Sequence, residues 1–280
     1  MHRRPIVIAN WKMYTSAAEA MTLASRVRTL ATGVDDVEIV LLPPVVWLPL
    51  LVEHLHHRPR SLNFGVQNFY PVDEGAFTGE VSGPMVKPMA RYALVGHSER
   101  RTLFNEDDEL IHKKLVASFE LGLSPILCVG ELTKVALTKR GRGRPTVLQR
   151  ESDIYRQLDS ALAGMSTRHI ENLVVAYEPL WAVGTGNNVP AAHVEEVLVS
   201  LRKLLIDRFG ELPASRIRMV YGGSVTAETA QEYLAQPHID GFLVGGASRD
   251  LGQFSRIVSL LAERAHHRIQ HPEHESQGGI

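Results

Sequence analysis

Short apolar runs alternate with longer amphipathic segments along most of this chain, and this alternation limits the possible folds more than any other feature. The runs are rich in Val, Ile and Leu and show no polar alternation, which is typical of parallel strands buried on both faces. They span Ile6–Ala9, Val37–Leu42, Asn63–Val66, Tyr92–Val95, Ser124–Val129, Leu173–Tyr177, Ile217–Tyr221 and Asp240–Val244. The pattern predicts an α/β protein with parallel strands.

Amphipathic segments with helical periodicity lie between most of these runs. They span Ala17–Leu30, Glu106–Leu121, Leu148–Ala163, Val194–Phe209, Ala227–Leu234 and Leu251–Ala265. Eight strand signals, each followed by a helix or a loop, favour a single-domain (β/α)8 barrel, with an open doubly wound sheet as the alternative. A dinucleotide-binding open sheet is disfavoured, because the first run continues into Asn10-Trp11-Lys12 without any glycine-rich turn.

Composition excludes several classes of protein. The chain has 280 residues, 44% of them hydrophobic, and a formal net charge of −1, so no global charge favours nucleic acid or an anionic membrane as a partner. The most apolar stretch, residues 39–52, contains three prolines and is shorter than the roughly 20 residues that a membrane span needs. The single cysteine excludes an intrachain disulfide and a cysteine-based zinc cluster. We expect a cytoplasmic protein with a catalytic barrel over residues 1–265 and a disordered tail over 266–280.

Unusual polar residues follow the predicted strands at the point where each strand ends. In a barrel of this kind the carboxyl ends of the strands form one mouth, where active sites lie. The strand ends carry Asn10 and Lys12, residues 96–101, Gly130 and Glu131, residues 178–186, residues 222–224 and residues 245–248. Taken alone, Lys12 is typical of a surface lysine, His97 of a structural histidine and Glu178 of a helix cap. Their shared position is what indicates a site.

Two glycine pairs, Gly222-Gly223 and Gly245-Gly246, follow the last two strands. Glycine lets the backbone approach an anion closely, and a helix that starts after such a turn offers unpaired N–H groups. Loops after strands 7 and 8 are the common phosphate site of these barrels. The sequence therefore predicts a phosphorylated ligand.

Seven motifs, in order along residues 4–265, resemble those of the triosephosphate isomerase family. They are residues 10–13 (NWKM), 75–80 (GAFTGE), 96–101 (GHSERR), 127–131 (LCVGE), 176–186 (AYEPLWAVGTG), 221–225 (YGGSV) and 240–248 (DGFLVGGAS). The resemblance implies interconversion of dihydroxyacetone phosphate and D-glyceraldehyde 3-phosphate through an enediolate, in glycolysis and gluconeogenesis. It implies neither a metal nor an organic cofactor.

The resemblance also assigns roles to residues. Glu178 would be the catalytic base, His97 a neutral electrophile, Lys12 the cationic stabiliser, Glu99 a supporting carboxylate and Asn10 a substrate-orienting group. Backbone amides would hold the phosphate at Gly184, Ser224, Gly245 and Gly246. A mobile lid would comprise Pro179, Leu180, Trp181, Ala182, Val183, Gly184, Thr185 and Gly186. Leu180, Val183 and Leu243 would form an apolar wall beside the base, and Tyr221 and Ser224 would latch the closed lid.

The segment from Gln67 to Glu80 resembles the family's long third loop, which docks into a partner subunit. This implies a homodimer in which the partner buries Phe77 and Thr78, two residues less polar than a surface loop usually carries.

The chain departs from the family pattern in two places. The far hinge of the lid reads Asn187-Asn188 where lysine is usual, from which we expect altered opening rates and intact chemistry. Residues 132–149 are usually acidic and helical, whereas here they include the basic loop Thr138–Pro145, which we interpret as a solvated surface loop. Cys128 is interpreted as a small buried hydrophobe.

Two alternatives stay open at this point. A barrel isomerase acting on a four-carbon ketose phosphate would keep Lys12, His97 and Glu178 but change the lid, and the intact Val183-Gly184-Thr185-Gly186 favours the triose. A non-catalytic phosphate-binding protein could use the same scaffold, because a fold alone does not confer activity. Such a scaffold would have no need of the complete catalytic set.

Overall fold

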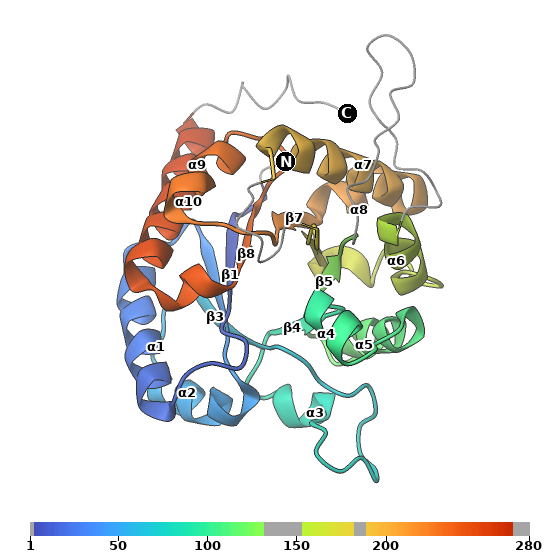
Figure 1. Cartoon of the computed structure of the whole chain (residues 1–280), viewed down its shortest axis with the longest axis horizontal. Helices are drawn as coiled ribbons and strands as arrows, with labels where there is room; N and C mark the ends of the chain where they lie inside the picture. The colour runs from blue at the N-terminus through green and yellow to red at the C-terminus, as the bar shows by residue number, and fades with distance from the viewer. Residues whose placement is uncertain (1–2, 132–152, 182–188, 271–280) are drawn as a thin grey trace.

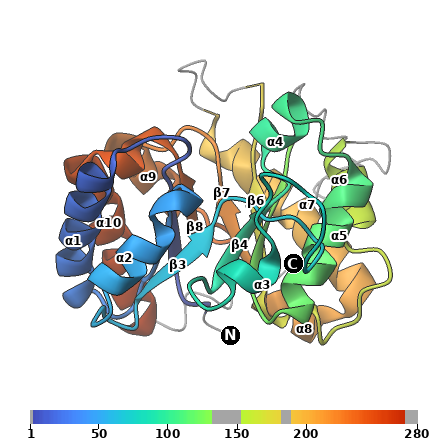
Figure 2. The same cartoon turned by 90° about the horizontal axis from the view of Figure 1, so that it is seen from below.

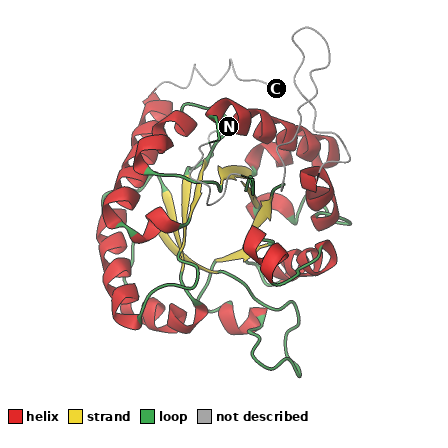
Figure 3. Ribbon diagram, in the orientation of Figure 1, coloured by secondary structure: helices red, strands yellow, loops and turns green. Residues whose placement is uncertain are grey.

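A closed ring of parallel strands forms the centre of the computed structural model, and helices surround it (Figures 1 and 3). The structure describes residues 3–131, 153–181 and 189–270. Each strand pairs with the next one along the chain, and β8 pairs with β1 to close the ring. This confirms the predicted single-domain (β/α)8 barrel and excludes the open doubly wound sheet.

The strands lie where the apolar runs predicted them, to within one or two residues. They are β1 (Ile6–Asn10), β2 (Glu38–Leu42), β3 (Leu62–Val66), β4 (Tyr92–Val95), β5 (Ser124–Val129), β6 (Val174–Tyr177), β7 (Arg218–Tyr221) and β8 (Gly241–Val244).

The outer layer consists of helices that follow the strands along the chain. They are α1 (Ala17–Thr32), α2 (Leu48–His54), α3 (Gly83–Val86), α4 (Ser98–Leu103), α5 (Asp108–Glu120), α6 (Asp153–Ala161), α7 (Ala191–Phe209), α8 (Glu211–Arg216), α9 (Ala227–Leu234) and α10 (Leu251–Gln270), with short 3-10 turns η1 (Val45–Trp47), η2 (Ile170–Asn172) and η3 (Gly246–Arg249). Figure 2 shows α1 and α10 on one flank of the strands and α5 and α7 on the other.

Three helices differ from their predicted bounds by three residues or more. α7 begins three residues earlier than expected, at Ala191. Pro190 has the backbone angles of a residue that precedes a helix, and it therefore sets the start of α7. α6 begins at Asp153, and the predicted residues before it lie outside the described part of the chain. α10 continues to Gln270, so the expected domain boundary at residue 265 falls inside a helix, and residues 271–280 lie outside the described residues.

Alternation along the strands separates two apolar layers. On β1, Ile6 and Ile8 belong to the cluster inside the barrel, while Val7 and Ala9 pack in the layer between strands and helices. Cys128 is fully buried in the inner cluster, as expected for a small hydrophobe.

Closure of the ring depends on one glycine. Gly241, at the start of β8, pairs with Ile6 of β1, and a side-chain carbon at this position would lie 1.7 Å from the Ile6 carbonyl oxygen. Only glycine allows the two strands to approach this closely.

The segment between β3 and α3 projects from the body of the molecule (Figure 1). It folds back on itself, since the Tyr70 N–H donates to the Val81 carbonyl at 2.8 Å and the Tyr70 and Phe77 rings lie 4.5 Å apart. Phe77 is nevertheless 41% exposed. The predicted docking segment is therefore an ordered and exposed projection.

Candidate active site

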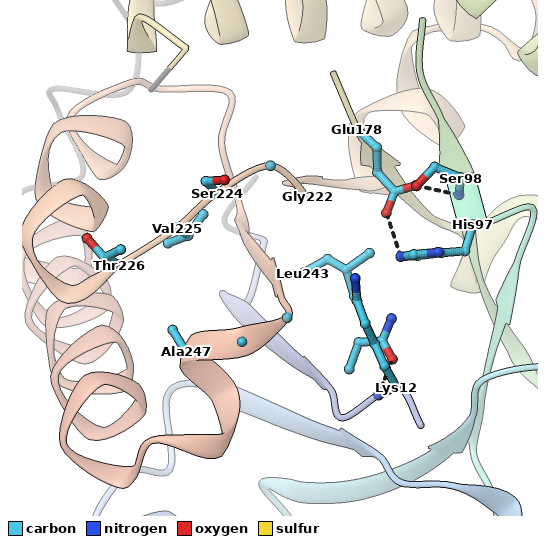
Figure 4. Close-up of a pocket in the computed structure, with 14 residues that line it drawn as sticks. Lys12, His97, Ser98, Glu178, Gly222, Ser224, Val225, Thr226, Leu243 and Ala247 are labelled. Carbon is cyan, nitrogen blue, oxygen red and sulfur yellow. Dashed lines mark hydrogen bonds and ion pairs between the residues drawn. The ribbon is translucent and has the colours of Figure 1, made fainter. Parts of the chain in front are cut away.

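A cavity of about 350 Å³ opens at the carboxyl ends of the strands. It brings together seven residues that the sequence predicted for the site: Asn10, Lys12, His97, Glu178, Ser224, Gly245 and Gly246 (Figure 4). They come from the ends of five different strands. The predicted convergence on one mouth is therefore present in the structure.

Glu178 follows β6, and its backbone continues the pairing of β6 with β5, since its N–H donates to the Val129 carbonyl at 2.8 Å. Gly130 makes room for it, because a side-chain carbon there would lie 1.8 Å from the Glu178 carbonyl oxygen. The Glu178 carboxylate is only 3% exposed and lines the cavity. Its Oε2 accepts a hydrogen bond from the Ser98 N–H at 2.9 Å, and its Oε1 lies 3.1 Å from His97 Nε2 (Figure 4).

His97 follows β4 and is the N-terminal cap of α4. Its Nδ1 accepts the Glu99 backbone N–H at 3.2 Å. An accepting Nδ1 carries no proton, so the ring's proton lies on Nε2, the atom that faces Glu178 Oε1. The Glu99 backbone N–H therefore favours the ring tautomer whose Nε2–H faces Glu178 Oε1.

Lys12 follows β1 in a left-handed backbone conformation, with φ 53°. Its N–H donates to Asn10 Oδ1 at 3.1 Å, and its carbonyl accepts from Gln67 Nε2 at 2.9 Å. The Lys12 ammonium pairs with Glu99 Oε1 at 2.6 Å. Glu99, 44% exposed at its side chain, stands outside the cavity lining and reaches the site through Lys12.

Two short glycine-containing segments form the opposite side of the cavity. Gly222 to Thr226 and Gly245 to Ala247 line it, and these segments lead into α9 and η3. No heavy atom lies within 4 Å of where a side-chain carbon would stand on Gly246. Open space beside glycine N–H groups at the start of a helical turn suits an anion such as phosphate.

Of the predicted lid, the structure describes Pro179 to Trp181. The predicted lid residues Ala182, Val183, Gly184, Thr185 and Gly186 lie outside the described residues, as do Asn187 and Asn188. Of the predicted apolar wall, Leu243 lines the cavity, and Leu180 packs where a Gly130 side chain would otherwise stand. The basic loop Thr138–Pro145 also falls outside the described residues.

Trp181, in the described part of the predicted lid, donates a hydrogen bond to the buried carboxyl group of Glu131. Tyr177 O–H and Trp181 Nε1–H both donate to Glu131 Oε1, each at 2.8 Å. Glu131 is 2% exposed, and burial raises its pKa to about 7 despite these two donors. Tyr221, predicted as part of the latch, is buried with its ring 4.5 Å from that of Tyr233.

Sequence reasoning gave neither Gln67 nor Ser98 a role of its own in the site, although Gln67 opens the predicted docking loop and Ser98 lies in the strand-end segment 96–101. Gln67 fixes the Lys12 carbonyl, and the Ser98 N–H holds the Glu178 carboxylate. Gln67 stands directly after β3. Ser98 stands directly after His97, a strand-end residue that the sequence had already singled out. Applying the strand-end rule to every strand would have found Gln67.

The described residues form neither a metal-binding cluster nor a membrane-spanning helix. No group of three or more His, Cys, Asp or Glu side chains is arranged to hold a metal ion within them. None of the helices they form has the length and apolarity that crossing a bilayer requires.

Comparison with known proteins gives one family. The family model for triosephosphate isomerase matches residues 5–261. A triosephosphate isomerase from Moorella thermoacetica is 42% identical over 258 residues, which cover 92% of this chain and 98% of that protein. Triosephosphate isomerases from Symbiobacterium thermophilum and a Synechococcus species are 41% and 44% identical, over 93% and 92% of this chain and 98% and 96% of their own lengths.

Proposed function

This chain belongs to the triosephosphate isomerase family and interconverts dihydroxyacetone phosphate and D-glyceraldehyde 3-phosphate, and on that premise we propose that Glu178, His97 and Lys12 carry out the reaction. The observation that supports these roles is that a carboxylate, a neutral imidazole and an ammonium group surround one cavity.

Glu178 takes the proton. The reaction moves a proton between two adjacent carbons, and the carbon-bound proton is a weak acid, so the base must be ionised and close to it. A carboxylate that accepts the Ser98 N–H and faces the His97 ring is oriented toward the cavity before substrate arrives. The apolar side chain of Leu243 beside it limits hydration of the carboxylate.

His97 and Lys12 stabilise the negative charge that develops on the substrate oxygens. Donors that are already in place at such oxygens contribute several kcal/mol in a site sheltered from water. His97 offers its Nε2–H as a neutral donor, and Lys12 offers a full positive charge that Glu99 orients. Asn10 fixes the backbone of Lys12 and thereby its direction.

The phosphate lies against the amides of Ser224, Gly245 and Gly246, and the lid, Pro179 to Gly186, brings the amide of Gly184 onto it. Tyr221 and Ser224 latch the lid when it is closed. A closed lid keeps water from the enediolate and prevents loss of its phosphate.

The protein acts as a cytoplasmic homodimer. The projection between β3 and α3 supports the dimer, because it leaves the apolar residue Phe77 41% exposed beside the exposed Thr78. Mass measurement in solution tests this, with Phe77→Glu as the variant expected to give a monomer.

A coupled isomerase assay on the purified chain tests the reaction and its substrate. We expect a higher kcat/KM for the triose phosphate than for a four-carbon ketose phosphate, and the reverse order would assign the chain to the larger substrate.

The Lys12→Met variant tests the proposed role of Lys12. Losing a preorganised cation should lower kcat by about 100- to 1,000-fold. A Lys12→Met enzyme with unchanged kcat would remove Lys12 from its role.

A further inference from the structure

A second contact joins the loop that carries Lys12 to the glycine turn after β8. The guanidinium carbon of Arg249 lies 3.7 Å from the centroid of the Tyr14 ring. Tyr14 stands in the loop between β1 and α1, two residues after Lys12, and Arg249 ends η3, the turn that begins at Gly246. The distance is well within the roughly 6 Å at which a cation over an aromatic face is attracted to it.

The loop that carries Lys12 is held at its two ends. Lys12 and Thr15 both have positive φ angles, 53° and 86°, which are unfavourable for residues other than glycine and persist only where the surroundings impose them. Gln67 holds the Lys12 carbonyl, and Trp47 Nε1 donates to the Thr15 carbonyl at 3.2 Å. Between these two points the Tyr14 ring, packed against Arg249, attaches the middle of the loop to the rest of the mouth.

The Arg249 side of the contact is rigid. The buried Ser248 donates from its hydroxyl and from its N–H to the Gly245 carbonyl, at 2.6 Å and 3.0 Å, so the backbone before Arg249 is fixed relative to Gly245. The Lys12 side chain also passes close to this turn, since a side-chain carbon on Gly245 would lie 3.6 Å from Lys12 Cε. The two loops therefore meet twice, at Lys12 and at Tyr14.

We propose that Tyr14 and Arg249 are positioning residues, whose stacked side chains fix the Lys12 loop at a set distance from the glycine turn. The inference deepens the proposed function and rests on the role given there to Lys12. A triose phosphate spans both loops, with its oxygens at Lys12 and its phosphate at the turn, whereas inorganic phosphate needs the turn alone. The stack therefore matters for the sugar phosphate and not for free phosphate.

Steady-state kinetics on the full chain tests this with Tyr14→Leu, Arg249→Met and the double variant. Each single change should raise KM for dihydroxyacetone phosphate about two- to five-fold, the range expected for one exposed cation–π contact. The double variant should be no worse than either single one, because the two side chains make one contact. The inhibition constant of inorganic phosphate should stay at the wild-type value in all three.

Two further variants serve as controls. Tyr14→Phe keeps the ring and should retain the wild-type KM. Arg58→Met removes another arginine–aromatic contact, in which Arg58 lies 5.1 Å from the Phe64 ring, before the start of β3 and far from the mouth, and should leave KM unchanged.

Three results would overturn the proposal. They are an unchanged KM in both single variants, additive effects in the double variant, or an inhibition constant for phosphate that rises in parallel with KM in Arg249→Met. The last would mean that Arg249 acts on the phosphate by its charge. Failure of the proposed function is a separate result, since it would appear as a Lys12→Met enzyme that keeps its kcat.

Discussion

The two ends of the barrel both bury carboxylates, but they surround them differently. At the end where the strands begin, Glu38 pairs through Oε2 with Arg218 Nη1 at 2.6 Å and through Oε1 with Asn63 Nδ2 at 2.9 Å. Asp240 at the same end accepts Arg3 Nε at 2.8 Å and the Met219 N–H at 2.8 Å. Neither residue lines the cavity at the mouth.

At the end where the strands finish, Glu178 has partners but also faces open space. Its two oxygens contact the Ser98 N–H and the His97 ring, and its side chain lines the cavity beside Lys12. A buried charge that reaches no cavity can only hold the fold together, whereas one that borders a cavity can exchange a partner for a ligand. Burial alone therefore does not identify a carboxylate that can act on a ligand. Burial combined with access to a cavity does identify one.

Shortening one glutamate at each end tests this comparison most strongly. Glu178→Asp withdraws the carboxylate by one methylene, and because both distance and proton transfer suffer, kcat should fall about 100- to 10,000-fold. The melting temperature should change little. Glu38→Asp is the matched control at the opposite end and should leave kcat per folded molecule unchanged. A normal kcat in Glu178→Asp would break the comparison.

Removing the charge of Glu38 should affect stability instead of catalysis. Glu38→Gln leaves the largely buried Arg218 without its counter-ion, which should lower the free energy of unfolding by about 3–5 kcal/mol. Denaturant unfolding measures this change, and the isomerase assay should show unaltered kcat for the folded fraction.

The stability loss in Glu38→Gln should also depend on pH. Burial alone would raise the pKa of Glu38, but Arg218 and the hydrogen bonds bring that pKa below its ordinary value of 4.5. Because its pKa is lowered in the folded protein, ionised Glu38 contributes to the free energy of unfolding. This contribution is fully present above pH 4.5 and is lost as the pH falls through the pKa that Glu38 has in the folded protein. The difference between wild type and variant should therefore shrink in acid. A constant difference across this range would contradict the pairing with Arg218.

The mouth was more predictable from the sequence than the opposite end, for a physical reason. Strand-end residues such as Lys12, His97 and Glu178 are located by topology once the strands are known, because parallel strands finish at one edge. The charged partner of Glu38 at 2.6 Å comes from a strand far along the chain, and no local pattern pairs Glu38 with Arg218, which is 180 residues away.

The short helices could not be predicted from the sequence either. The six-residue helix α8 and the four-residue helix α3 are too short for a helical period to appear, so packing decides their conformation. The contact between Tyr14 and Arg249 joins residues from opposite ends of the chain and needed coordinates to be seen.

Glu131 sharpens the comparison, because it lies at the mouth end yet is absent from the cavity lining. Burial raises the pKa of Glu131 from 4.5 to about 7, so the folded protein holds a proton that the unfolded chain has already released between these two values. Unfolding between pH 4.5 and about 7 therefore releases a proton. The stability that neutral Glu131 contributes is fully present below pH 4.5 and is lost as the pH rises to about 7.

Glu131→Gln should remove this dependence, because the amide oxygen still accepts from Tyr177 and Trp181 without ever carrying a charge. The variant should match wild type in unfolding free energy near pH 4 and exceed it by about 3 kcal/mol at pH 8. Urea unfolding at a series of pH values measures the two curves. Parallel curves would show that Glu131 has the same pKa in the folded and unfolded states, and that a carboxylate at the mouth can be buried at no cost even without the cavity beside it.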